Sequence, residues 1–213
     1  MLTIGRLNEM LELQEKLEVR IDGDDWRDKG HDYRLCVHME CAEIIDHYPW
    51  KHWKGAVNTL IDEDAVAMEI VDVWHFAMAF VLMSPKFDSK VFHYQILEAI
   101  EEYDYEEERT VDQLCIGLSY GMYATGQFPL GNFIGLMNLV EMDFDQLYKL
   151  YVAKNVLNWF RQDNDYATGL YLKNWAGKED NEHVQELIEL LEDDLTAGIL
   201  YDHLKQRYAL VVR

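Results

Sequence analysis

Residues 65–83 read AVAMEIVDVWHFAMAFVLM, an apolar run that ends just before Pro85. Its polar members are Glu69, Asp72 and His75, which are spaced three apart and so share one helical face. A helix that is apolar nearly all round is buried in a protein core. Two central acids make a membrane span costly, and buried carboxylates need a partner or a metal ion. The run therefore predicts a core helix over about 64–84 whose acids have a function.

The preceding predicted helix carries a second pair of acids. It covers about 34–48, RLCVHMECAEIIDHY, ends at Pro49 and contains Glu40 and Glu43 in an apolar setting. Two helices joined by so short a connection are expected to pack antiparallel, which brings the four carboxylates together. Neither 35–45 nor 65–83 contains Arg or Lys to neutralise them. Because like charges this close repel, the pattern indicates that a cation binds between the two helices.

The ligand chemistry of this site favours a hard metal ion. Carboxylate oxygens without cysteine or paired histidines are typical of Mg²⁺, with Mn²⁺ as a possible substitute. A di-iron carboxylate bundle would need a Glu-x-x-His motif on two helices. Asp72-Val-Trp-His75 is one approximate copy, and the C-terminal half offers none, so this alternative is disfavoured. His75 itself fits either a ligand contact or an ordinary buried histidine.

The cations of so acidic a chain are informative. It has 40 acidic and 19 basic residues, which disfavours a nucleic-acid or anionic-membrane partner. Lys154, Asn158 and Arg161 share one face of a predicted helix, and Lys173 and Asn181 follow. Such side chains can hold an oligophosphate, although basic residues at a helix end can also simply offset the helix dipole. Near the first carboxylate helix, Trp50 and Trp53 fit either base stacking or core packing.

The rest of the chain predicts an all-α fold in a single domain over 1–213. Helices are expected at about 2–20, 88–108, 110–125, 130–141, 143–161, 181–192 and 195–208. The glycine-containing segment 162–180 has no periodicity, and we expect a long mobile loop that closes over substrate. Three cysteines without zinc spacing indicate free thiols, and with no secretory pattern at the N-terminus they favour a cytoplasmic location.

Three segments together resemble a known family. MECAEIIDHYPWKHWK, MEIVDVWHF and YVAKNVLNWFRQDNDYATGLYLKNWAGKEDN look like the signature segments of the dimeric, all-α dUTPases, which belong to the MazG-like nucleotide pyrophosphohydrolases. The likeness spans most of the chain and is least specific over about 85–140. It implies a helical bundle with a four-carboxylate Mg²⁺ site, a homodimer, and hydrolysis of dUTP, and of dUDP, to dUMP.

The resemblance also implies roles for individual residues. The metal ligands would be Glu40, Glu43, Glu69 and Asp72, and we expect Glu43, or else Glu40, to activate the attacking water. Contacts to base and sugar would come from Gln14, Trp53, His75 and Phe76. Contacts to the phosphates would come from Lys54, Lys154, Asn158, Arg161, Tyr171, Lys173 and Asn181.

Two positions depart from the family pattern. Glu18 stands where the LQxxLN motif has Asn, and Asp165 stands where FRQxNGY has Gly. The first departure bears on base selectivity and the second on the turn of the loop. Two alternatives to a dUTPase follow: a MazG-like pyrophosphohydrolase of another nucleotide such as dCTP, and a nucleotide-binding protein without turnover.

Overall fold

The computed structural model describes residues 2–54, 60–105, 107–191 and 195–211, and this part of the chain is mostly helical. The helices are α1 (Ile4–Asp22), α2 (Tyr33–Asp46), α3 (Glu63–Leu82), α4 (Ser89–Glu102), α5 (Val111–Thr125), α6 (Leu130–Leu139), α7 (Phe144–Asp163), α8 (Asp180–Leu191) and α9 (Ala197–Tyr208). Short 3₁₀ turns lie at Trp26–Asp28, His52–Lys54 and Tyr166–Thr168, and two short strands are β1 (Asn174–Trp175) and β2 (Lys178–Glu179). The predicted all-α fold is confirmed.

Helix α3 is the central helix of the larger hydrophobic core. Asp62 caps its N-terminus by accepting a hydrogen bond from the backbone of Ala65 at 3.1 Å. Its apolar side chains, among them Val66, Ile70 and Trp74, are fully buried. By length and composition α3 could cross a membrane, but more than half of its apolar window, 56%, is buried inside the protein. The prediction of a core helix is therefore confirmed.

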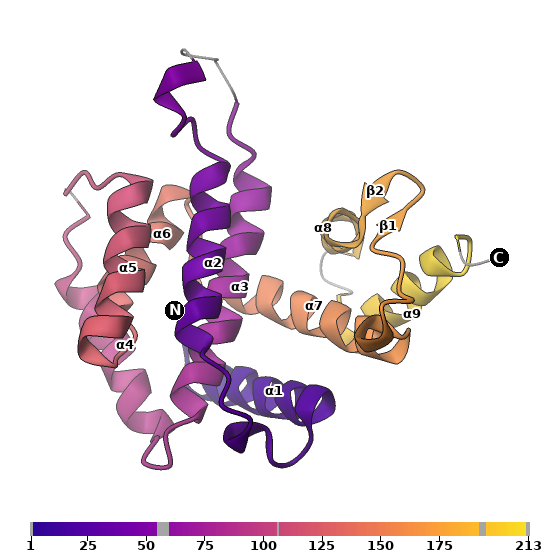
Figure 1. The fold of residues 1–213 in the computed structure, drawn as a ribbon, viewed down its shortest axis with the longest axis horizontal. Coiled ribbons are helices and arrows are strands. Elements are labelled where there is room, and N and C mark those ends of the chain that lie inside the picture. The colour runs from indigo at the N-terminus through magenta and orange to yellow at the C-terminus, as the bar shows by residue number, and fades with distance from the viewer. Residues whose placement is uncertain (1, 55–59, 106, 192–194, 212–213) are drawn as a thin grey trace.

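The neighbours of α3 set the geometry of the carboxylates. Figure 1 shows α2 and α3 side by side and antiparallel, and they share the most extensive helix–helix contact in the fold. Helix α5 packs on α2, and α1 and α7 pack on α3. Helices α4 to α6 lie on the opposite side of α2 and α3 from the C-terminal elements (Figure 1). Helices α3 and α8 both pack on α7, so Asp72 on α3 and Asn181 at the start of α8 lie near that helix.

Helix α7 joins two hydrophobic clusters. Its first half contributes Leu147 and Tyr151 to the main core, and its second half contributes Leu157 and Phe160 to a separate cluster with the C-terminal elements. Figure 1 shows α7 extending away from the main body, with the hairpin, α8 and α9 at its far end. One helix therefore carries residues from the main core out to the C-terminal part.

One predicted boundary was wrong. Helix α4 ends at Glu102 instead of near 108, since the acidic run 101–108 would place negative charge at a helix C-terminus, where the dipole disfavours it. The segment 162–180, predicted as a long loop, contains short elements. Its backbone forms a 3₁₀ turn and an antiparallel hairpin, and Tyr171 and Trp175 are buried in the C-terminal cluster. Two residues alone give no periodic signal over the segment, and their burial comes from tertiary contacts.

The departure at Asp165 is compatible with the turn that follows α7. Asp165 has φ 65° and ψ 30°, the left-handed conformation that glycine adopts most easily. Aspartate is among the few other residues that tolerate this conformation, because its short polar side chain can hydrogen-bond locally. The chain therefore makes a left-handed turn at this position without glycine.

Candidate functional site

Three of the four predicted carboxylates converge where α2 faces α3. One carboxylate oxygen from each of Glu40, Glu43 and Glu69 lies within 4.8 Å of the others. Glu40 and Glu69 are half-buried, while Glu43 is exposed at the edge of the cluster. The three-residue spacing on α2 puts Glu40 and Glu43 on one face, and the antiparallel packing brings Glu69 opposite them. Carboxylate oxygens gathered in this way fit a hard divalent cation.

The fourth carboxylate, Asp72, has a basic partner from another helix. Nζ of Lys154 on α7 donates to Oδ2 of Asp72 at 2.7 Å and to Oδ1 of Asn181 at 3.0 Å. The Lys154 side chain is only 3% exposed, so this is a nearly dry ion pair. The two acidic helices contain no such partner in sequence, and the expectation that all four acids are unneutralised was therefore wrong for Asp72.

The charge of the cluster remains poorly compensated. Burial, together with the negative charges of Asp72, Glu43 and Glu69, raises the pKa of Glu40 to about 8. Burial and Asp72 also raise the pKa of Glu69, and Lys154 acts in the opposite direction on both. His47 Nε2 lies 3.8 Å from Glu69 Oε1. A bound divalent cation would relieve this repulsion, so the residues present fit the metal that the sequence predicts.

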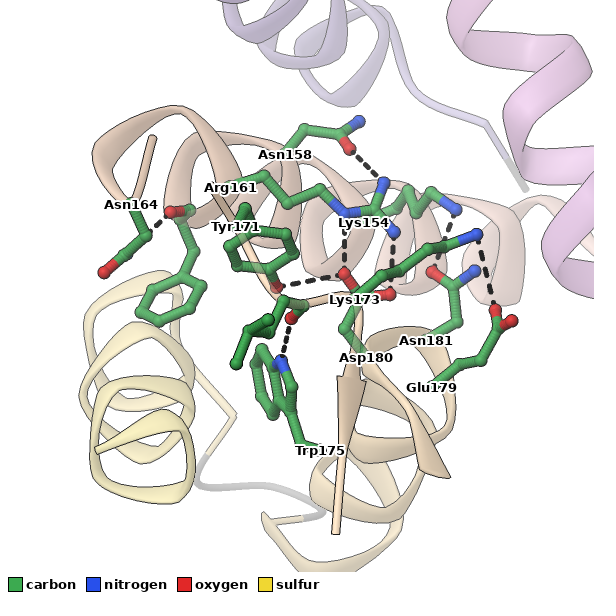
Figure 2. A network of polar contacts seen from close by, with 12 residues as sticks. Lys154, Asn158, Arg161, Asn164, Tyr171, Lys173, Trp175, Glu179, Asp180 and Asn181 are labelled. Atoms are coloured by element: carbon green, nitrogen blue, oxygen red, sulfur yellow. Dashed lines mark hydrogen bonds and ion pairs between the residues drawn. The ribbon is translucent and has the colours of Figure 1, made fainter. Parts of the chain in front are cut away.

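A second polar cluster links α7 to the hairpin and the start of α8 (Figure 2). Arg161 donates from Nε and from its second terminal nitrogen to the two carboxylate oxygens of Asp180, both at 2.8 Å. Its other terminal nitrogen donates to Asn158 at 3.1 Å, and Tyr171 Oη donates to Asp180 at 3.0 Å. Burial disfavours the charged guanidinium, but Asp180 outweighs it and raises the pKa of Arg161. The pair fastens the hairpin to α7.

Several of the residues predicted to bind phosphate lie in or next to this cluster. Figure 2 shows Lys154, Arg161, Lys173 and Asn181 gathered between α7 and the hairpin. Lys173 is about half exposed and lies 3.4 Å from Glu179, so its ammonium group is accessible to solvent. Arg161 and Tyr171 are instead buried and already bonded to Asp180. The side chain of Lys54 lies outside the described part of the chain.

The predicted base and sugar residues fall into two groups. Gln14 and His75 are buried and in contact, with 2.8 Å between Gln14 Oε1 and His75 Nδ1. Phe76 is half-buried, and its ring centroid lies 6.5 Å from that of Tyr33. Trp53 is 63% exposed on the 3₁₀ turn after α2.

Exposure decides between the two interpretations of the tryptophans. Trp50 and Trp53 pack edge to face with each other, 5.5 Å between centroids, and both are exposed. Core packing is therefore wrong for both. An exposed pair of indole rings beside the acidic helices is available to stack on a planar ligand.

With this geometry in place, comparison with known proteins identifies the family. A family model described as dUTPase matches residues 6–166, which is most of the chain. The chain belongs to the family of dimeric, all-α dUTPases. No curated protein shows significant similarity to it.

Family membership assigns a dUTP diphosphatase activity and confirms the resemblance found in the sequence. These dUTPases are metal-dependent nucleotide hydrolases, in agreement with the carboxylate cluster. The matched span runs from α1 through α7 and contains Glu40, Glu43, Glu69 and Asp72. It ends at 166, before Tyr171, Lys173 and Asn181.

The structure also places residues next to the predicted site residues that the sequence did not indicate. Asp180 accepts three hydrogen bonds and is completely buried, although in sequence it is one acid among many. Tyr151 stacks on His75 with 4.1 Å between ring centroids. His47 approaches Glu69 from the end of α2. No local signal marks these residues, because each acts through a contact with a distant segment.

Proposed function

We propose that the protein hydrolyses dUTP, and dUDP, to dUMP in a reaction that depends on Mg²⁺. The observation that carries this proposal is the cluster of Glu40, Glu43 and Glu69 beside the Asp72–Lys154 pair. These four acids would hold the metal, with Mn²⁺ as a possible substitute. When bound, the metal supplies charge neutralisation on the phosphate oxygens.

The protein's own residues supply the remaining chemistry. Glu43 is the exposed member of the cluster and has access to solvent, so we assign it the orientation and deprotonation of the attacking water, with Glu40 as the second candidate. Asn158, Lys173 and Asn181 would bind phosphate oxygens. The ammonium group of Lys154, which bonds to Asp72, would also contact the phosphate oxygens.

Arg161 and Tyr171 have a more restricted role. Arg161 uses three of its five N–H donors on Asp180 and Asn158, which leaves two for a phosphate. Tyr171 holds the same carboxylate, so both residues would position the hairpin next to the substrate. Closure of the C-terminal part over the nucleotide would then exclude water.

Base and sugar recognition is proposed for the group around α1 and α3. Gln14 would contact the uracil edge through the one amide N–H that Glu18 does not use, Trp53 would stack on the base, and His75 and Phe76 would lie against the deoxyribose. Lys54 would join the phosphate contacts.

We also propose that the protein works as a homodimer in the cytoplasm. Light scattering of the purified protein tests the dimer.

A purified-protein assay with Mg²⁺ and a panel of nucleotides tests the function. We expect dUTP to be used at least about 100-fold better than dCTP, dTTP or UTP, as a site that hydrogen-bonds the correct edge can achieve. Glu69→Ala should abolish turnover with the helical content unchanged, and Glu63→Gln, an exposed acid on the same helix, should behave as wild type. Full activity in excess chelator, or in Glu69→Ala, would contradict the proposal.

A second candidate substrate is dCTP, and the departure at Glu18 is the reason to test it. Glu18, where the family pattern has Asn, is buried against Gln14 and can only accept hydrogen bonds when ionised. The cytosine amino group donates where the uracil carbonyl accepts. Equal or better kcat/KM for dCTP in the same assay would select this alternative, and binding without turnover would indicate a nucleotide-binding protein.

A further inference from the structure

A buried chain of hydrogen bonds runs from α1 to α3 beside the proposed nucleotide site. Gln14 Nε2 donates to Glu18 Oε1 at 2.7 Å, and Tyr33 Oη donates to Glu18 Oε2 at 2.8 Å. On its other side, Gln14 Oε1 lies 2.8 Å from His75 Nδ1 and 3.0 Å from Tyr151 Oη. Gln14, Glu18 and His75 are all at least nine-tenths buried. None of these bonds involves the carboxylate cluster.

Glu18 determines which way the Gln14 amide points. Burial raises the pKa of Glu18, while the hydrogen bonds from Tyr33 and Gln14 act in the opposite direction and stabilise the carboxylate form. In that form the side chain accepts hydrogen bonds and cannot donate, so it faces the amide nitrogen of Gln14. The amide oxygen is then turned toward His75 and Tyr151. An Asn in place of Glu18 could present either its oxygen or its nitrogen to Gln14, and both orientations of Gln14 would be satisfied. The carboxylate removes that freedom.

The orientation of Gln14 in turn selects the tautomer of His75. An oxygen facing Nδ1 requires a hydrogen on Nδ1, because two acceptors cannot bond to each other. Burial, aided by the nearby charge of Lys154, lowers the pKa of His75 to about 3, so the ring is neutral and carries one hydrogen. Nε2 therefore presents a lone pair. This atom is buried and has no partner among the described residues.

A buried polar atom without a partner costs free energy and points to a ligand or a water molecule. We propose that Glu18 is a positioning residue: through the Gln14 amide it holds His75 as the Nδ1–H tautomer, so that Nε2 accepts a hydrogen bond from a hydroxyl group of the nucleotide. The inference rests on the proposed function in placing the nucleotide against His75. A deoxyribonucleotide esterified at the 5′ position has one free hydroxyl, at the 3′ carbon, which is the donor that this acceptor would bind.

The tautomer can be measured without any turnover. Long-range ¹H–¹⁵N correlation spectra of the metal-free, nucleotide-free protein distinguish a protonated ring nitrogen from a bare one, and His75→Asn assigns the signals. In the wild type we expect hydrogen on Nδ1 and none on Nε2. In Glu18→Gln, which keeps the shape but can face Gln14 with either end, we expect exchange between both tautomers. Glu18→Asn serves as a second variant if Glu18→Gln does not fold.

Tyr33→Phe is the matched control for this measurement. It removes the hydrogen bond to the other carboxylate oxygen and leaves Glu18 facing Gln14, so the wild-type tautomer should persist. A hydrogen on Nε2 of the wild type, or identical spectra for the wild type and the neutral variants, overturns the proposal. Because no substrate is present, this result is independent of whether the protein is a dUTPase.

A kinetic comparison tests the consequence for the substrate. Removing the 3′-hydroxyl from dUTP should lower kcat/KM of the wild type by about tenfold, the effect of one buried hydrogen bond. In Glu18→Gln the same change should cost clearly less, because Nε2 is then partly protonated and cannot accept. Equal discrimination in the wild type and Glu18→Gln overturns the role of Glu18, whereas failure of both enzymes to turn over dUTP contradicts the proposed function instead.

Discussion

At the scale of single residues, Lys154 partly offsets the negative charge of the carboxylate site. Burial and the neighbouring acids raise the pKa of Glu40 and Glu69, and Lys154, which is buried and contacts Asp72, acts in the opposite direction on both. Removing one partner of a buried ion pair leaves an uncompensated charge. The free-energy cost of that charge is larger than the stabilisation that the intact pair provides. The site therefore depends on α7 even before substrate binds.

Substituting Lys154 separates these effects. We expect Lys154→Met to destabilise the metal-free protein by about 3 kcal/mol, since Asp72 loses its partner. Mg²⁺ should bind more tightly to the variant because a competing positive charge has gone, while kcat/KM should fall by about 100-fold through loss of a phosphate contact. Calorimetric titration measures the change in Mg²⁺ affinity, and chemical denaturation measures the change in stability.

Lys149→Met is the control, since Lys149 is exposed on the same helix. It should change the stability by no more than about 0.5 kcal/mol, as surface substitutions usually do. Weaker Mg²⁺ binding by Lys154→Met would show that Lys154 supports the metal site by holding the carboxylates in place rather than by balancing their charge.

At the scale of elements, the hairpin is fastened to α7 through one carboxylate. Asp180 begins α8, accepts from Arg161 and Tyr171, and donates from its backbone to the carbonyl of Lys173 at 2.9 Å. Trp175 packs on Phe160 with 5.8 Å between centroids. The hairpin is therefore ordered by one buried ion pair and by aromatic contacts, while Lys173 stays exposed (Figure 2).

Removing the charge of Asp180 should loosen the hairpin locally. We expect Asp180→Asn to lower the free energy of local opening by about 3 kcal/mol, because Arg161 is left as a buried charge with a neutral partner. Hydrogen–deuterium exchange of residues 166–179 should accelerate, and exchange within α2 and α3 should stay as in the wild type. Glu179→Gln, at an exposed neighbouring position, should leave both unchanged. Acceleration throughout the molecule would contradict a local role for Asp180.

At the scale of the whole molecule, the buried His75 links stability to pH. Its pKa is about 3 in the folded protein, because of burial and Lys154, against 6.5 as the ordinary value. Below pH 6.5 the unfolded chain gains a proton that the folded protein does not bind. Above pH 6.5, His75 is neutral in both states and does not lower the free energy of unfolding. As the pH falls from 6.5 toward 3, it progressively destabilises the fold.

The magnitude of this effect can be measured. Between pH 7.5 and 5.0, His75 should account for a loss of about 2 kcal/mol in the free energy of unfolding. Denaturation with chelator present, at several pH values, should show a steeper loss for the wild type than for His75→Gln. His38→Gln, an exposed position on α2, should retain the wild-type slope. Identical slopes for the wild type and His75→Gln would refute this assignment.

Sequence patterns predicted the main body well because they depend on local periodicity. Residues 65–83 alone indicated a buried helix with functional acids, and the pairs on α2 and α3 meet as expected for Glu40, Glu43 and Glu69. The burial of Tyr171 and Trp175, in contrast, could not be predicted from local periodicity. Their burial depends on α7 and α9, which lie far away in sequence, so their segment had the appearance of a loop.

The amino-acid sequence was enough to predict the helical class, the family and the two acidic helices, because repeating apolar positions and short connections constrain neighbours along the chain. The partners of the charged groups, in contrast, depend on the three-dimensional packing. It pairs Asp72 with a lysine 82 residues later, buries Arg161 against Asp180, and places His75 against Gln14. Ion pairs and buried hydrogen bonds have no periodicity in sequence, since they form wherever packing brings donor and acceptor together away from water.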